Sequence, residues 1–163
     1  MNPVLEQQVG KVSEANVENK NGNHASTNSD SLNVLIVDDS APARQFIEIK
    51  IKELMDSTDY QLFTADSGED ALAMFEKCQI DLIFLDVEMP GISGLEVCKR
   101  IREKSDRARI VMLTGRSLSA DYVSGRDAGC NHYLTKPPAD GDVQTILTLS
   151  RLKKSMKGGF SVT

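Results

Sequence analysis

The stretch Val34–Ser40, VLIVDDS, decides the fold, because it runs from an unbroken apolar strand directly into charge. Its apolar residues are mostly β-branched and lack the polar alternation of a half-exposed strand. Unbroken runs of this kind are typical of parallel sheets, which are covered on both faces. The run ends in two adjacent carboxylates, Asp38 and Asp39, which are costly to bury unless a positive charge lies between them.

Similar apolar runs recur at regular intervals. The expected strands are 33–38, 60–65, 80–85, 109–114 and 131–135. Between and after them, apolar residues repeat every three or four positions, as in Ala43, Ile47, Ile51 and Leu54, which predicts helices. Strand–helix units with short connections predict an α/β protein: a five-stranded parallel sheet with helices on both faces.

The expected helices differ in how clearly the sequence marks them. Two begin with a capping box, Ser67-x-x-Asp70 and Ser93-x-x-Glu96. The segment 119–127 has the weakest pattern, because few of its apolar residues fall on one side. We expect it to be either a mobile element or an ordinary, poorly patterned surface helix.

Composition narrows the class of protein. The chain has 163 residues, about the size of one domain, and a net charge of −5, which disfavours nucleic acid as a partner. Cys78, Cys98 and Cys130 lack the spacing of a zinc site, and we expect buried thiols in a reducing compartment. The sequence has no signal peptide and no apolar run near the ~18 residues of a membrane span. We therefore expect a cytoplasmic location without membrane contact.

The chain divides into three parts by composition. Residues 1–31 are rich in Asn and Ser and are expected to form a flexible arm, followed by a domain at 32–154 and a short flexible tail at 155–163. Few residues follow the last helix, so we expect a stand-alone domain without direct DNA binding. Its basic residues are expected to be a solvated helix end: Arg151, Lys153, Lys154 and Lys157.

The polar residues at the strand ends point to chemistry, since the crevice of a parallel sheet lies beyond the carboxyl ends of its strands. These residues are Asp38, Asp39, Asp86, Thr114 and Lys136. Each alone is explained by a turn, a cap or a loop. Together, three carboxylates suit Mg²⁺, while a lysine and a threonine suit phosphoryl oxygens. The set predicts phosphoryl transfer onto an aspartate.

Four motifs together resemble the receiver domain of two-component response regulators, the family that includes the chemotaxis regulator. They are VLIVDDS, DLIFLDVEMPGISGLEVCKRIR, IVMLTG and GCNHYLTKP, and the resemblance spans roughly 33–154. It implies a (βα)5 flavodoxin-like receiver fold. It also implies a signalling phosphoacceptor, not an enzyme with a separate substrate, that receives its phosphoryl group from a histidine kinase or a histidine phosphotransfer protein and acts on a downstream protein.

The resemblance also assigns the acidic residues. Asp86 would be the phosphoacceptor and a metal ligand, and Asp38 and Asp39 would hold Mg²⁺, for which Mn²⁺ can substitute. The backbone carbonyl of Glu88 would complete the protein ligands. By the family pattern, one of the paired aspartates binds the ion directly and the other through water.

The remaining family positions concern the phosphoryl group and the response to it. Lys136 would contact the phosphoryl group, and Pro137 would follow it through a cis peptide bond. Thr114 would swing toward the phosphoryl group, and the orientation of Tyr133 would report that movement. The output face would then be the fourth helix, fifth strand and fifth helix, roughly 119–154.

Two further positions are expected to tune the lifetime of the phosphoryl group. Glu88 and Arg116 lie at the rim, where opposite charges could form a bridge that hinders the hydrolytic water. His132, in the expected fifth strand, is interpreted as a surface or partly buried strand residue and not as a phosphotransfer residue.

Two alternatives compete with this interpretation. One is a degenerate receiver that serves as a constitutive interaction module. The other is a haloacid-dehalogenase-type phosphohydrolase, which also uses an aspartate nucleophile, a lysine and Mg²⁺. That class expects a D-x-D nucleophile on the first strand and the acidic pair last, whereas here the pair comes first and Asp86 begins D-V-E.

Overall fold

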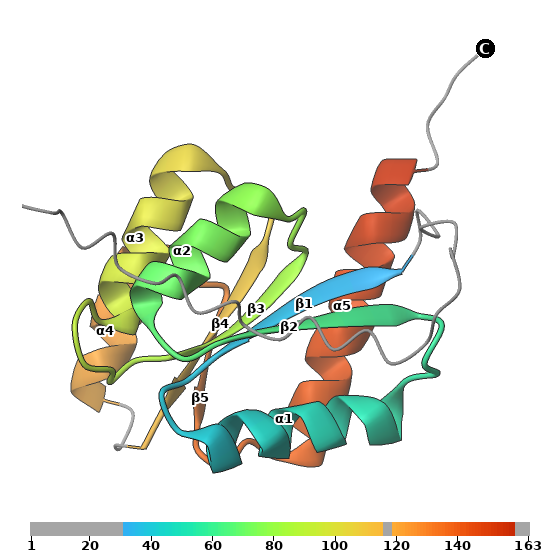
Figure 1. Ribbon diagram of the computed structural model, residues 1–163, viewed down its shortest axis with the longest axis horizontal. Helices are drawn as coiled ribbons and strands as arrows, with labels where there is room; N and C mark the ends of the chain where they lie inside the picture. Colours follow the sequence, from blue (N-terminus) through green and yellow to red (C-terminus); the bar gives the residue numbers. More distant parts are fainter. Residues whose placement is uncertain (1–30, 116–118, 159–163) are drawn as a thin grey trace, which may run out of the picture.

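Strands and helices alternate along the part of the chain that the computed structural model describes, residues 31–115 and 119–158 (Figure 1). The strands are β1 (Leu32–Val37), β2 (Tyr60–Ala65), β3 (Leu82–Asp86), β4 (Arg109–Thr114) and β5 (His132–Thr135). The helices are α1 (Ala41–Leu54), α2 (Gly68–Lys77), α3 (Gly94–Lys104), α4 (Ser119–Asp127) and α5 (Asp140–Gly158). Every predicted strand is present, and the largest shift is at β3, which includes Asp86.

The strands form one parallel sheet in the order β2-β1-β3-β4-β5, which confirms the predicted fold class. β1 lies between β2 and β3, and its Val34 is opposite both Leu62 and Leu82. The chain therefore extends the sheet in one direction after β1 and in the other direction after β2. A change of direction of this kind opens a crevice beyond the carboxyl ends of the flanking strands, here β1 and β3.

Alternate residues of the buried strands supply two separate cores. In β1, Leu35 and Val37 face the core under α2 and α3, whereas Val34 and Ile36 face the core under α1 and α5. Figure 1 shows α1 and α5 on one face of the sheet and α2, α3 and α4 on the other. Both faces are covered, which explains why the strands need the unbroken apolar runs that the sequence contains.

Serine side chains mark three helix starts. Ser67 Oγ accepts a hydrogen bond from Asp70 N (3.1 Å) and Ser93 Oγ accepts one from Glu96 N (3.3 Å), which confirms both predicted helix starts. Ser40 caps α1 in the same way. α1 begins four residues after β1, and Gly94 N at the start of α3 donates a hydrogen bond to the carbonyl of Val87, the residue after β3, so both N-termini lie at the carboxyl edge of the sheet.

The C-terminal helix differs from the prediction in two respects. α5 continues to Gly158, so the expected tail is helical over 155–158. The expectation of a solvated basic end is wrong for Lys153 and Lys154, which are partly buried against acceptors at the edges of the neighbouring elements, whereas Arg151 is exposed. Arg151 pairs with Asp59 (2.9 Å), Lys153 donates to the Arg107 carbonyl (2.9 Å), and Lys154 donates to Asp81 (2.7 Å) and to the Ser31 carbonyl (2.6 Å).

The α4 helix, predicted at 119–127, has these bounds in the structure. Its Val123 side chain is 58% exposed, in keeping with the weak apolar pattern of this segment. Arg116, to which the sequence assigns a part in phosphoryl lifetime, lies outside the described residues. Among the helices described, none is both long enough and apolar enough to cross a membrane.

Candidate functional site

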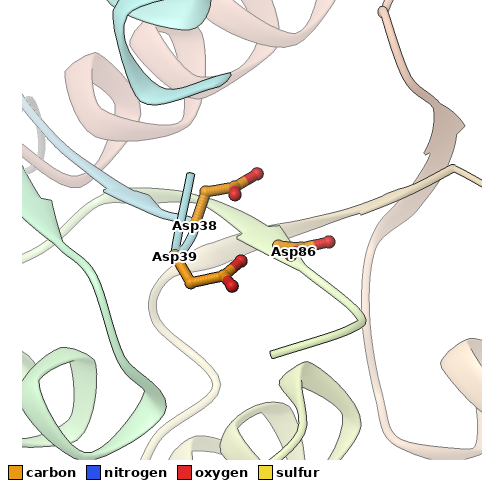
Figure 2. Close-up of side chains that lie close together, drawn as sticks. All are labelled: Asp38, Asp39 and Asp86. Carbon is orange, nitrogen blue, oxygen red and sulfur yellow. The ribbon is translucent and has the colours of Figure 1, made fainter. Parts of the chain in front are cut away.

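Three carboxylates meet at the carboxyl edge of the sheet. Asp38 and Asp39 directly follow β1, and Asp86 is the last residue of β3. One oxygen from each lies within 4.8 Å of the others, and Figure 2 shows the three side chains extending to the same side. Asp38 and Asp86 are buried, at 3% and 4% exposure, whereas Asp39 is exposed. Adjacent parallel strands bring these residues together, as the sequence predicts.

Lys136 brings a positive charge to the two buried carboxylates. Its Nζ lies 3.0 Å from Asp86 Oδ1 and also donates a hydrogen bond to Asp38 Oδ2. Its backbone N donates to the Thr114 carbonyl (2.7 Å), which fixes the end of β5 to the end of β4. The Lys136–Pro137 peptide bond is cis, as the resemblance implies.

Burial and the single cation Lys136 act in opposite directions on the pKa values of this cluster. Burial raises the pKa of the Asp86 carboxyl, the Asp38 charge adds to the increase, and the Lys136 hydrogen bond opposes it. Burial acts to lower the pKa of Lys136, but its hydrogen bonds to Asp38 and Asp86 outweigh burial and the net pKa is raised. Lys136 is therefore charged at neutral pH, and its single ammonium group is shared by the two buried carboxylates.

Backbone groups orient both buried carboxylates. Asp38 Oδ1 accepts a hydrogen bond from Ser40 N (2.9 Å), and Asp86 Oδ1 accepts one from Glu88 N (3.3 Å). These bonds fix the side chains at the entrance to the crevice. The metal contact of the Glu88 carbonyl stays a prediction.

The donor set fits a small divalent cation. Carboxylate oxygens are the ligands that Mg²⁺ prefers, and octahedral ligands at about 2.1 Å from the ion lie roughly 3 to 4 Å from one another. The observed separation of the three oxygens, within 4.8 Å, needs only small side-chain adjustments to reach that range. The exposed Asp39 leaves one side of the site open to water and to a ligand.

The two predicted switch residues lie on neighbouring strands. Thr114 is the last residue of β4, is fully buried, and lies opposite Thr135 of β5. Tyr133 lies opposite Met112 and belongs to the core on the α2, α3 and α4 side of the sheet. Thr114 thus lies on β4 two residues beyond Met112, at the end of the strand that is next to the carboxylate cluster.

Two residues that support the site have no assigned role in the sequence analysis. Arg44 of α1 donates a hydrogen bond of 2.6 Å to the Asp38 carbonyl. A Cβ atom at Gly94, the first residue of α3, would lie 2.0 Å from the Asp86 carbonyl oxygen. Gly94 therefore permits α3 to begin against the backbone of Asp86. The feature of the sequence that could have indicated this role is the position of Gly94 directly after the capping residue Ser93.

A small apolar hollow of about 190 Å³ lies beside the site, between α1 and the segment that follows β5. Its lining residues are Asp38, Ala43, Phe46, Ile47, Leu113, Lys136, Pro137 and Pro138. Phe46 is partly exposed at its rim, at 37%. The hollow places apolar surface next to the Lys136 ammonium group.

The fold and the site define a class: an α/β protein with a parallel sheet and a cluster of carboxylates and one lysine at its carboxyl edge. The model of the response regulator receiver domain family matches residues 34–148. The chain belongs to this family and is the receiver domain of a two-component response regulator.

Curated relatives agree with this assignment. The regulatory protein VanR of Enterococcus faecium is 35% identical over 123 residues, which cover 74% of this chain and 51% of that protein. The transcriptional regulatory protein ResD of Bacillus subtilis is 38% identical over 104 residues, which cover 64% of this chain and 41% of that protein. The chain thus spans about half the length of these relatives, or less.

Solved structures agree as well. The chemotaxis response regulator CheY4 of Vibrio cholerae is 30% identical, with a TM-score of 0.64 that covers 74% of this chain and 98% of that one. A chain in the co-crystal structure of the Saccharomyces cerevisiae histidine phosphotransfer signaling protein Ypd1 and the receiver domain of Ssk1 is 25% identical. Its TM-score is 0.67, covering 76% of this chain and 92% of that one.

Proposed function

We propose that this receiver accepts a phosphoryl group on Asp86 from a phosphohistidine of a histidine kinase or a histidine phosphotransfer protein. The observation that carries the proposal is the cluster of three carboxylates with Lys136 Nζ 3.0 Å from Asp86 Oδ1. A nucleophilic carboxylate, an ammonium group and ligands for a hard cation are the groups that phosphoryl transfer to aspartate requires.

The transfer is a displacement at phosphorus. An oxygen of Asp86 forms a bond to phosphorus as the phosphorus–nitrogen bond of the phosphohistidine breaks, and the imidazole nitrogen keeps the electron pair and takes up a proton. Lys136 then pairs with a phosphoryl oxygen. The carboxylates and the Glu88 carbonyl would hold Mg²⁺, or Mn²⁺ in its place, and the ion would offset negative charge on the phosphoryl oxygens.

Phosphorylation changes the packing around β4 and β5. The new group carries about two negative charges and three acceptor oxygens, which attract the Thr114 hydroxyl and Lys136. Movement of Thr114 opens space beside Tyr133 and so favours the inward position of its ring. The output surface is α4, β5 and α5, through which the domain acts on a downstream protein and not on DNA. Glu88 and Arg116 set how long the phosphoryl group survives.

The apolar hollow beside Lys136 supports a protein as the phosphoryl donor. A phosphohistidine must reach Asp86 past Lys136, and a donor helix with apolar side chains can pack against Phe46 of α1 while it does so. The Ypd1–Ssk1 co-crystal structure supports a histidine phosphotransfer protein as a partner. A cytoplasmic location is also part of the proposal and accords with the three free cysteines.

Intact-mass measurement tests the proposal. The protein is incubated with a small phosphodonor, such as acetyl phosphate, with Mg²⁺ or with a chelator. We expect a mass gain of one phosphoryl group that requires Mg²⁺ and is absent in Asp86→Ala. Asp66→Ala is the matched control, because Asp66 follows β2 but lies outside the carboxylate cluster, and it should label normally.

The same assay separates the alternatives. Turnover of a phosphomonoester without a stable mass gain would indicate a phosphohydrolase. A folded protein that gains no mass at any Mg²⁺ concentration, and that transfers none from a panel of phosphorylated kinases, would indicate a degenerate receiver. Either result would contradict a receiver that holds a phosphoryl group on Asp86.

A further inference from the structure

Gly125 occupies a buried position within α4, directly against the Tyr133 ring. A Cβ atom at this position would lie 2.6 Å from Tyr133 Cδ2 and 2.7 Å from Cε2. Carbon atoms that are not bonded to each other stay well beyond 3 Å apart, with an optimum at about 3.5 to 4 Å. The ring edge therefore fills the space that any other residue at position 125 would occupy.

The backbone does not require this glycine. Among the described residues, the glycines with positive φ are Gly91 and Gly129, so Gly125 has an ordinary backbone conformation. Gly129 closes the end of α4, with φ +89° and a hydrogen bond from its N to the Arg126 carbonyl (3.0 Å). Glycine inside a helix is less favourable than alanine. Glycine at position 125, which faces Tyr133, therefore makes α4 less stable than alanine would.

Tyr133 lies inward in this structure. Its side chain is 9% exposed and belongs to the same core cluster as Cys98 and Ala128. Its ring joins β5 to α4 through the contact with Gly125. Rotation of the ring away from α4 is the movement that would relieve a clash there, because Tyr133 is on the edge strand of the sheet.

We propose that Gly125 is a positioning residue of the switch: its missing side chain admits the Tyr133 ring against α4 and so sets the population of the inward ring. This inference rests on the proposed function, because it makes Gly125 part of the response of Thr114 and Tyr133 to phosphorylation. If phosphorylation favours the inward position of the Tyr133 ring, then by thermodynamic linkage the inward position also favours phosphorylation. A residue that expels the ring must then also disfavour phosphorylation.

The first test measures the ring directly. The chain has three tyrosines, so labelling with 3-fluorotyrosine gives three ¹⁹F resonances, and Tyr133→Phe assigns the one of interest. In Gly125→Ala we expect this resonance to show the larger solvent isotope shift of an exposed ring. Gly141→Ala is the matched control, since this helical glycine has no atom within 4 Å of the added Cβ. It should leave the resonance unchanged.

The second test measures phosphorylation by acetyl phosphate with saturating Mg²⁺. Gly125→Ala should slow the reaction about three- to tenfold, because the competent population falls by that factor. Gly141→Ala should react at the wild-type rate. An unchanged rate in Gly125→Ala together with a buried Tyr133 ring would overturn the inference.

A double variant shows whether the effect passes through the ring. In Tyr133→Ala the ring that would clash with the added methyl group is absent. Adding Gly125→Ala should therefore neither slow phosphorylation nor lower the denaturation midpoint. If Gly125→Ala still slows phosphorylation or lowers the denaturation midpoint in the Tyr133→Ala background, the inference is contradicted. This comparison also decides the case in which the single variant Gly125→Ala folds poorly. Failure of the wild type to label would contradict the proposed function instead, while the ¹⁹F measurement would still decide on Gly125.

Discussion

The two ends of the sheet carry opposite charges and satisfy them in different ways. At the amino end, cationic side chains of α3 and α5 donate to backbone carbonyls and to Asp81, so these side chains find acceptors within the chain. At the carboxyl end, Asp38, Asp39 and Asp86 face one another with Lys136 as their cation. The difference separates structure from function: Arg102, Lys153 and Lys154 at the amino end connect elements of the fold, whereas at the carboxyl end three carboxylates share one cation.

Arg102 is the clearest case at the amino end. Its guanidinium group joins α3 to the loops before β4 and β5 by four hydrogen bonds. The acceptors are the carbonyls of Gly129 (2.7 Å), Ser105 (3.4 Å) and Ala108 (2.9 Å) and the Asn131 side chain (2.8 Å). Asn131 Oδ1 also accepts from Ile110 N (2.8 Å), so the network reaches the start of β4.

The largest expected effect is on this network. Arg102→Ala leaves several partly buried carbonyls without a donor and should lower the free energy of unfolding by about 3 kcal/mol. Arg100→Ala is the control on the same helix, since its ion pair with Glu96 is exposed and should contribute about 0.5 kcal/mol or less. Urea denaturation measures both. Equal losses for the two variants would show that the amino end is not held by Arg102.

The second effect is at the carboxyl end. If the carboxylates bind Mg²⁺ only in the folded state, the ion should stabilise the protein by about 2.7 kcal/mol at a hundred times its dissociation constant. Thermal denaturation at increasing Mg²⁺, at constant ionic strength, measures the shift. Arg102→Ala should keep the full Mg²⁺ response because it lies at the other end of the sheet. No shift in the wild type would contradict a cation site.

A smaller effect of opposite sign is expected for Asp39→Asn. With a chelator present, removing one of three adjacent negative charges relieves repulsion and should stabilise the protein by up to about 1 kcal/mol. The same variant should bind Mg²⁺ more weakly in a calorimetric titration. Asp66→Asn, at the end of β2, should change neither quantity. If Asp39→Asn is less stable than the wild type without Mg²⁺, repulsion among the three carboxylates does not lower the stability of the protein.

The smallest effect concerns His132 at the amino end, which is partly buried in β5 as predicted. Arg109 Nη1 lies 2.8 Å from His132 Nε2 and can only donate, so the imidazole is neutral there. Burial, with the Arg109 charge, lowers the pKa of His132 below its usual 6.5. The unfolded chain then binds more protons as pH falls below about 6.5, and stability declines.

Comparison with His132→Gln isolates this contribution. The variant should lose less stability than the wild type between neutral and mildly acidic pH, measured by urea denaturation at several pH values. Parallel pH profiles for the two proteins would rule out His132 as a source of the decline.

Much of the fold and the central site could be predicted, because both depend on short-range patterns. An unbroken apolar run predicts a strand covered on both faces, and the carboxyl ends of parallel strands share an edge. That argument brings Asp38, Asp86 and Lys136 together although they are far apart in sequence. The N-caps Ser67 and Ser93 follow from spacing alone.

What could not be predicted depends on the reach of side chains across the folded molecule. The sequence does not show that Lys153 and Lys154 find a carbonyl and a carboxylate, because the partners lie in other elements. Arg44 and Gly125 are likewise ordinary in a sequence. Their roles appear only when the Asp38 carbonyl and the Tyr133 ring are seen beside them.

The single lysine of the site has a consequence for the order of events. Three carboxylates against one ammonium group leave two net negative charges at the entrance to Asp86. A phosphodonor is itself an anion and is repelled by that excess, whereas a divalent cation cancels it. Productive encounters should therefore be ordered, with the metal ion arriving before the donor. If Asp86 is phosphorylated as proposed, low Mg²⁺ should limit the reaction by repelling the donor, even though Asp86 is already in place.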